Sequence, residues 1–136
     1  MVSKPKSILI VDDNDAVRNA FVYLFTYSGF RVWEASDGFE ALAAMRAEAP
    51  DILLSDLDMP AMSGFELLPI VRRRFPSVGV VAMSGTISCP SALEGIAAEA
   101  FYAKGTSCTA SLLKSVQTLL ERGVSSRNFG LMGDQG

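Results

Sequence analysis

Short apolar runs alternate with helix-like segments along most of this chain. The runs are apolar at nearly every position, as strands buried on both faces of a parallel sheet are, and they cover residues 8–11, 32–35, 52–54, 78–83 and 100–103. Right-handed crossovers between such strands place the intervening helices on both faces of the sheet. The pattern therefore predicts an α/β fold of five successive βα units around a five-stranded parallel sheet.

The segments between the runs repeat apolar residues at the spacing of a helix with one buried face. Clear stripes fall at residues 17–25, 41–49, 65–75 and 112–120, and a short, weak one lies around 92–98. Ser63 and Glu66 form a capping-box pattern at the start of the third clear stripe. Gly29 supplies a left-handed stop after the first stripe.

Composition limits what kind of protein this is. A length of 136 residues with 49% hydrophobic and 20% charged residues suits one globular domain, which we place at residues 1–122. From 123 to 136 the periodicity gives way to Gly, Ser and Asn, which predicts a flexible tail. A net charge of −3 without a basic run argues against direct nucleic-acid binding. The first apolar run is too short for a signal peptide or membrane anchor, so we expect a cytoplasmic protein with no membrane contact.

The residue types also exclude several kinds of site. The chain has no histidine, which removes histidine triads, histidine metal sites and imidazole proton shuttles. Its two cysteines, Cys89 and Cys108, are too few for a disulfide framework or a zinc site. Any chemistry must therefore use carboxylates, hydroxyls and lysine.

Polar residues of those types stand where the predicted strands end. Asp12 and Asp13 end the first run, Asp56 follows the third, Ser84 the fourth and Lys104 the fifth. Ligand sites of open parallel sheets lie outside the carboxyl ends of the strands, where the strand order reverses. In the order 2-1-3-4-5 that point lies between the first and third strands, so we expect the three aspartates to converge there.

Three carboxylates at one place repel one another unless a cation neutralises them. An all-oxygen ligand set favours a hard ion, Mg²⁺ or Mn²⁺. Lys104 and the Ser84 hydroxyl would then contact oxygens of a phosphoryl group carried by Asp56, the candidate nucleophile. Taken singly, each residue has an ordinary explanation, such as Asp13 or Asn14 capping the first helix. The hypothesis rests on all five arriving at one edge of the sheet.

At this point the sequence resembles the receiver domain of two-component response regulators, of the chemotaxis-regulator type. The resemblance covers nearly the whole chain, from about Ser7 to Arg122, and its most specific segments are ILIVDDN (8–14), DILLSDLDMPAMSGFEL (51–67), VVAMSG (80–85) and FYAK (101–104). It implies a flavodoxin-like fold that is phosphorylated by a sensor histidine kinase or a histidine phosphotransfer protein. Such a domain assists its own phosphorylation and dephosphorylation but is not otherwise an enzyme.

The resemblance also implies roles for individual residues. Asp56 becomes the phosphoacceptor, and Asp12 and Asp13 bind Mg²⁺ together with Asp56 and the backbone carbonyl of Asp58. Lys104 is the family's phosphate-contacting lysine, and Ser84 and Phe101 become the switch pair whose side chains move on phosphorylation. The implied output surface for a downstream protein is the fourth helix, fifth strand and fifth helix.

Three features depart from the family pattern. Gly105 stands where the family usually has a proline that fixes the loop after the lysine. The stretch from Ser84 to Lys104 is short, and Asp58 adds a negative charge two residues after the acceptor. We expect Asp58 to alter metal affinity or the rate of dephosphorylation.

Two other functions stay open. One is a receiver-like binding module that no longer switches, which Gly105 and the weak fourth helix would favour. The other is a phosphohydrolase with an aspartate nucleophile, suggested by Asp56-Leu-Asp58, although the acidic pair at 12–13 precedes the nucleophile here instead of following it. A nucleotide-binding protein is disfavoured, because no glycine-rich phosphate loop follows any strand.

Overall fold

The computed structural model describes residues 4–86 and 95–134, those from 123 onward by their backbone alone. These residues form five strands and four helices, which alternate along the chain except that no helix lies between β4 and β5 among the described residues. The strands are β1 (Ser7–Val11), β2 (Arg31–Ala35), β3 (Ile52–Asp56), β4 (Gly79–Ser84) and β5 (Ala100–Ala103). The helices are α1 (Asp15–Tyr27), α2 (Gly38–Ala47), α3 (Gly64–Arg74) and α4 (Thr109–Asp134).

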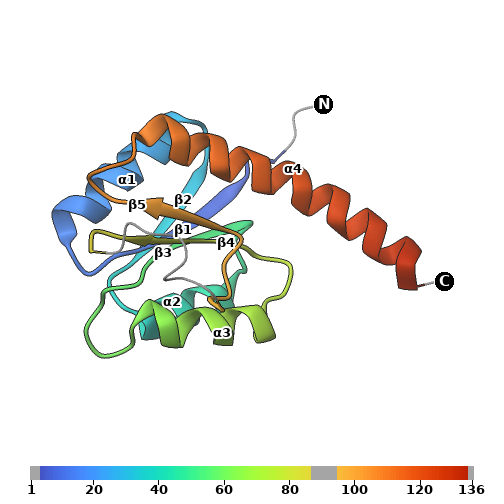
Figure 1. Cartoon of the computed structure of the whole chain (residues 1–136), viewed down its shortest axis with the longest axis horizontal. Coiled ribbons are helices and arrows are strands. Elements are labelled where there is room, and N and C mark those ends of the chain that lie inside the picture. The colour runs from blue at the N-terminus through green and yellow to red at the C-terminus, as the bar shows by residue number, and fades with distance from the viewer. Residues whose placement is uncertain (1–3, 87–94, 135–136) are drawn as a thin grey trace.

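The five strands make one sheet in the order β2-β1-β3-β4-β5, with every pair parallel. This confirms the predicted fold class and strand order. Helices α1 and α4 cover one face of the sheet, and α2 and α3 cover the other (Figure 1). The inner strands β1 and β3 are buried at all positions, whereas the edge strands β2 and β5 are partly exposed.

Successive residues of the inner strands face opposite sides of the sheet, which divides the core in two. Leu9 and Leu53 pack with the apolar faces of α2 and α3, and Ile8 and Ile52 pack with those of α1 and α4. Consecutive apolar residues in these strands are therefore required, because both faces are covered.

The helix starts follow the capping chemistry of the sequence. Asn14 caps α1 by accepting a hydrogen bond from the backbone N–H of Val17, and Asp37 caps α2. Ser63 Oγ accepts a hydrogen bond from the backbone N–H of Glu66 at 3.4 Å, which confirms the cap of α3. Each cap satisfies one of the backbone N–H groups that the first turn of a helix leaves without an internal partner.

The structure differs from the sequence-based expectation at two segments, residues 95–98 and residues 123–134. The weak helix around 92–98 lies partly outside the described residues, and its described part, 95–98, contains no helix. The backbone of α4 is helical as far as Asp134, across the segment expected as a flexible tail, and it extends past the edge of the sheet (Figure 1). Each residue added to an existing helix gains a local hydrogen bond, so helix can continue without apolar periodicity. The expected flexibility of residues 123–136 in solution stays a prediction.

A membrane-spanning helix is also absent from the part of the chain that the structure describes, since none of its helices is both long and apolar enough.

Candidate functional site

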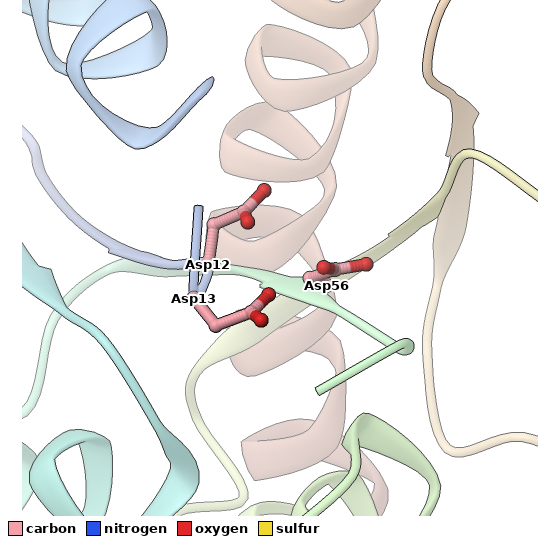
Figure 2. Close-up of side chains that lie close together, drawn as sticks. All are labelled: Asp12, Asp13 and Asp56. Atoms are coloured by element: carbon pink, nitrogen blue, oxygen red, sulfur yellow. The ribbon is translucent and has the colours of Figure 1, made fainter. Parts of the chain in front are cut away.

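Three carboxylates meet at the carboxyl ends of the two central strands. Asp12 and Asp13 directly follow β1, and Asp56 is the last residue of β3, the strand paired with β1. Each of the three offers a carboxylate oxygen within 4.8 Å of the others, and Figure 2 shows the side chains gathered at this edge. Asp12 is 0% and Asp56 2% exposed, while Asp13 faces solvent. The predicted convergence of the aspartates is confirmed.

The backbone around these residues holds the buried carboxylates in place. Asp12 Oδ1 accepts a hydrogen bond from the backbone N–H of Asn14 at 2.9 Å, and Arg18 donates to the Asp12 carbonyl at 2.8 Å. Asp56 Oδ1 accepts a hydrogen bond from the backbone N–H of Asp58 at 3.1 Å. Each buried aspartate is thus oriented by the loop that follows its own strand.

Lys104 provides positive charge at the centre of the site. Its Nζ lies 3.1 Å from Asp12 Oδ2 and 3.3 Å from Asp56 Oδ2, so it bridges the two buried carboxylates. Its backbone N–H donates to the carbonyl of Ser84 at 2.9 Å, which ties the end of β5 to the end of β4. Lys104 thus lies at the same sheet edge as the aspartates, as expected, and its contact with a phosphoryl oxygen stays a prediction.

Burial and charge act against each other on these groups. Burial raises the pKa of Asp56, while the N–H of Asp58 and the charge of Lys104 oppose the rise only in part. Burial alone would lower the pKa of Lys104, but its hydrogen bond to Asp12 and the charge of Asp56 raise that pKa above its ordinary value. One ammonium cannot neutralise three carboxylates, so an ionised site keeps an excess of negative charge.

The donor set fits a hard divalent cation. All three side chains offer carboxylate oxygens, the ligands that Mg²⁺ prefers, and they lie close enough to share one ion. A divalent cation would offset the excess negative charge that Lys104 leaves. The backbone carbonyl of Asp58, the further ligand implied by the resemblance, stays a prediction.

Ser84 ends β4 beside this cluster and is fully buried. Its hydroxyl donates a hydrogen bond to Asp58 Oδ2 at 2.7 Å and accepts one from the backbone N–H of Thr86 at 3.1 Å. The Thr86 hydroxyl donates to the same Asp58 oxygen at 3.2 Å. Thr86 was not predicted, although it is a hydroxyl residue two positions after Ser84. The expected effect of Asp58 on metal affinity or the rate of dephosphorylation stays a prediction, and the described contacts of its carboxylate are with Ser84 and Thr86.

Phe101 lies in β5 opposite Ala82 of β4 and is partly buried against the core on the α2 and α3 side. Its neighbour Tyr102 lies on the α1 and α4 side of the sheet, where its ring forms a T-shaped pair with that of Phe21. The Tyr102 hydroxyl donates a hydrogen bond to the carbonyl of Ser107 at 2.9 Å. The role of Phe101 as a switch stays a prediction.

Gly105 adopts φ +84°, in the left-handed region that proline cannot reach. The described residues contain no cis peptide bond. Lys104 is nevertheless aimed at both buried carboxylates. Glycine at this position therefore permits a left-handed turn directly after Lys104, and the lysine still contacts both buried aspartates. Part of the short segment from Ser84 to Lys104 lies outside the described residues.

Comparisons with known proteins agree with this geometry. The family model of the response regulator receiver domain matches residues 8–103. The transcriptional regulatory protein AfsQ1 of Streptomyces coelicolor is 32% identical over 90 residues, which are 65% of this chain and 40% of that protein. This chain spans less than half the length of the curated regulators that it matches most strongly.

Solved structures show the same fold over most of the chain. The CheY-like receiver domain protein of Methanospirillum hungatei superposes with a TM-score of 0.83 at 26% identity, covering 90% of this chain and 99% of that one. The response regulator TrrA of Thermotoga maritima, in complex with Mg(2+)-BeF, has a TM-score of 0.77 at 25% identity and covers 84% and 98%. With the strand order, the acidic cluster and the family match in agreement, this chain belongs to the response regulator receiver domain family, a family of signalling domains.

Proposed function

We propose that Asp56 accepts a phosphoryl group from a phosphohistidine of a kinase or phosphotransfer protein, and that this changes which protein the domain binds. Receiver domains take phosphoryl groups from histidine kinases and generally use Mg²⁺. The observation that carries the proposal is the arrangement of Asp12, Asp13 and Asp56 within 4.8 Å, with Lys104 bridging the two buried ones.

The residues divide the work of the transfer. A carboxylate oxygen of Asp56 attacks the phosphorus in line, and the bond from phosphorus to the imidazole nitrogen of the donor breaks. The hydrogen bond from the Asp58 N–H to Oδ1 orients the carboxylate, and Lys104 stabilises negative charge on the transferred oxygens. Asp12, Asp13, Asp56 and the Asp58 carbonyl would hold Mg²⁺, which supplies positive charge to phosphoryl oxygens when bound.

The signal then leaves through a shift between two packings. A phosphoryl group on Asp56 offers new hydrogen-bond acceptors to Ser84. Ser84 moves toward it, and the Phe101 ring turns into the space that Ser84 leaves. The surface that changes is β5, α4 (the fifth helix of the sequence pattern) and the described part of the expected fourth helix, residues 95–98, and a downstream protein binds there. A solved relative in complex with Mg(2+)-BeF supports a metal-assisted phosphoryl site of this design.

Phosphorylation by acetyl phosphate tests this function. Wild-type protein with Mg²⁺ and acetyl phosphate should gain the mass of one phosphoryl group, stable in acid and released by hydroxylamine as acyl phosphates are. Asp56→Asn should not gain it, and Asp37→Asn, at the cap of α2, is the matched control that should. A wild-type protein that gains no phosphoryl group would indicate a binding module instead. Sustained release of phosphate from an aryl phosphate would indicate a hydrolase.

A further inference from the structure

The carboxylate of Asp58 contacts the hydroxyl of Ser84 and is not a member of the acidic cluster. Its Oδ2 accepts hydrogen bonds from Ser84 Oγ at 2.7 Å and from Thr86 Oγ1 at 3.2 Å, and the two hydroxyl oxygens lie 3.1 Å apart. The cluster that could hold a metal comprises Asp12, Asp13 and Asp56. Asp58 therefore joins the acceptor loop to the end of β4 across 26 residues of sequence.

We propose that Asp58 is a positioning residue that holds Ser84 in the unphosphorylated state, so that phosphorylation must release it. This inference rests on the proposed function of Asp56. A serine hydroxyl carries one proton and can donate it to one acceptor at a time. Ser84 therefore cannot donate to Asp58 and to a phosphoryl oxygen on Asp56 together.

Phosphorylation would act on both ends of this contact. The phosphoryl oxygens offer Ser84 a charged acceptor that competes with the Asp58 carboxylate. At the same time the new negative charge lies next to Asp58, whose backbone N–H already contacts Asp56 Oδ1, so like charges repel. Asp58 is exposed, so once Ser84 has moved away its carboxylate can turn into water, which replaces the lost hydrogen bonds. Attraction of Ser84 and repulsion of Asp58 thus favour the same movement.

The consequence is a low population of the active packing before phosphorylation. A hydrogen bond to a charged acceptor is stronger than a neutral one, so Asp58 stabilises the unphosphorylated arrangement of Ser84 more than a neutral side chain would. Thr86 strengthens this by donating to the same oxygen and by binding Ser84 Oγ through its own N–H. Removing the carboxylate should raise the active population without any phosphoryl group present.

Amide NMR spectra of the full chain measure that population directly. Its two end points are the unphosphorylated wild type and the wild type saturated with Mg²⁺ and beryllofluoride. Without phosphate or metal, Asp58→Ala should move the amide signals of Gly85 and Tyr102 toward the beryllofluoride end point. The movement should correspond to a rise of about tenfold in the ratio of active to inactive protein. Asp58→Asn should raise the same ratio by about threefold. Because the unphosphorylated packing is the folded ground state, Asp58→Ala should also lower the urea midpoint, by no more than the lost contact stabilises, and Asp58→Asn should lower it less.

The same substitution in a Ser84→Ala protein distinguishes an effect of Asp58 on Ser84 from a general structural effect. If Asp58 acts through Ser84, then Asp58→Ala should move no signals further in a Ser84→Ala protein, because the coupling between the two sites is lost. Equal shifts in both backgrounds, or no shift of Asp58→Ala in the wild-type background, overturn the inference. Acetyl phosphate labelling of Asp56 in the same samples keeps the two proposals apart. Labelling without shifts refutes only the role of Asp58, and a wild type that is never labelled refutes both.

Discussion

Among the described glycines, a β-carbon added at Gly64 would come closest to the backbone of another segment, so replacing Gly64 tests how closely α3 is set against Asp56. Gly64 begins α3, and its N–H donates to the carbonyl of Leu57 at 3.2 Å. A β-carbon at this position would lie 2.5 Å from the carbonyl oxygen of Asp56 and 2.7 Å from Leu57 Cα. Real β-carbons essentially never approach closer than 3.0 Å, so the backbone must open by at least 0.5 Å.

The expected cost follows from those contacts. Forcing one extra carbon into a packed site costs about 1–3 kcal/mol. The reduced freedom of the unfolded alanine chain returns about 0.4–1 kcal/mol. We therefore expect Gly64→Ala to lower the free energy of unfolding by about 1–2 kcal/mol. Because the displaced atom belongs to Asp56, we also expect phosphorylation by acetyl phosphate to slow by about tenfold, as misplaced reacting groups do.

Equilibrium urea unfolding and the initial rate of phosphorylation measure the two effects. Gly79→Ala is the matched control, because its β-carbon would meet the end of the Ile52 side chain at 2.9 Å, and a terminal methyl can move aside. That control should stay within about 1 kcal/mol of the wild type and keep its phosphorylation rate. A Gly64→Ala protein as stable and as reactive as Gly79→Ala would refute the close setting of α3 against the acceptor strand.

Three further changes probe charge and backbone. Burial raises the folded-state pKa of Asp56, so the stability it contributes is full below its ordinary pKa and lost as pH rises through the folded value. In metal-free protein, Asp56→Asn should therefore unfold at higher urea than wild type at neutral pH, and this advantage should shrink as the pH falls; an advantage that grows toward acid would contradict it. Mg²⁺ at ten times its Kd should stabilise the wild type by about 1.4 kcal/mol in the same assay. The gain at that concentration should be smaller in Asp13→Asn, and an equal gain would place the ion elsewhere. Gly105→Ala should cost about 1–2 kcal/mol because of its φ of +84°, whereas Gly85→Ala, whose β-carbon would only touch Lys104 Cε at 3.9 Å, should not; equal stabilities would show that the turn can rearrange.

The parallel sheet and the acidic cluster follow from local features of the chain, whereas the strand order was predicted through the resemblance to receiver domains. Consecutive apolar residues require a sheet covered on both faces, and polar residues that end such strands must meet at one edge. The pattern of the chain alone therefore places Asp12, Asp56 and Lys104 together, and the fold brings them within ion-pair distance. The capping residues Asn14 and Ser63 are also predictable, because each cap bonds within three residues of itself.

Other features depended on contacts between distant segments. The direction of the Asp58 carboxylate is set by Ser84 and Thr86, which lie 26 and 28 residues away, and no periodicity reports which rotamer a loop residue takes. The φ of Gly105 reflects how the end of β5 joins α4. The sequence by itself thus determined the parallel sheet and the group of residues at its edge, because burial and strand ends leave a pattern in the chain. Only the tertiary structure decided how the Ser84 hydroxyl is held, because that depends on side chains meeting across two loops.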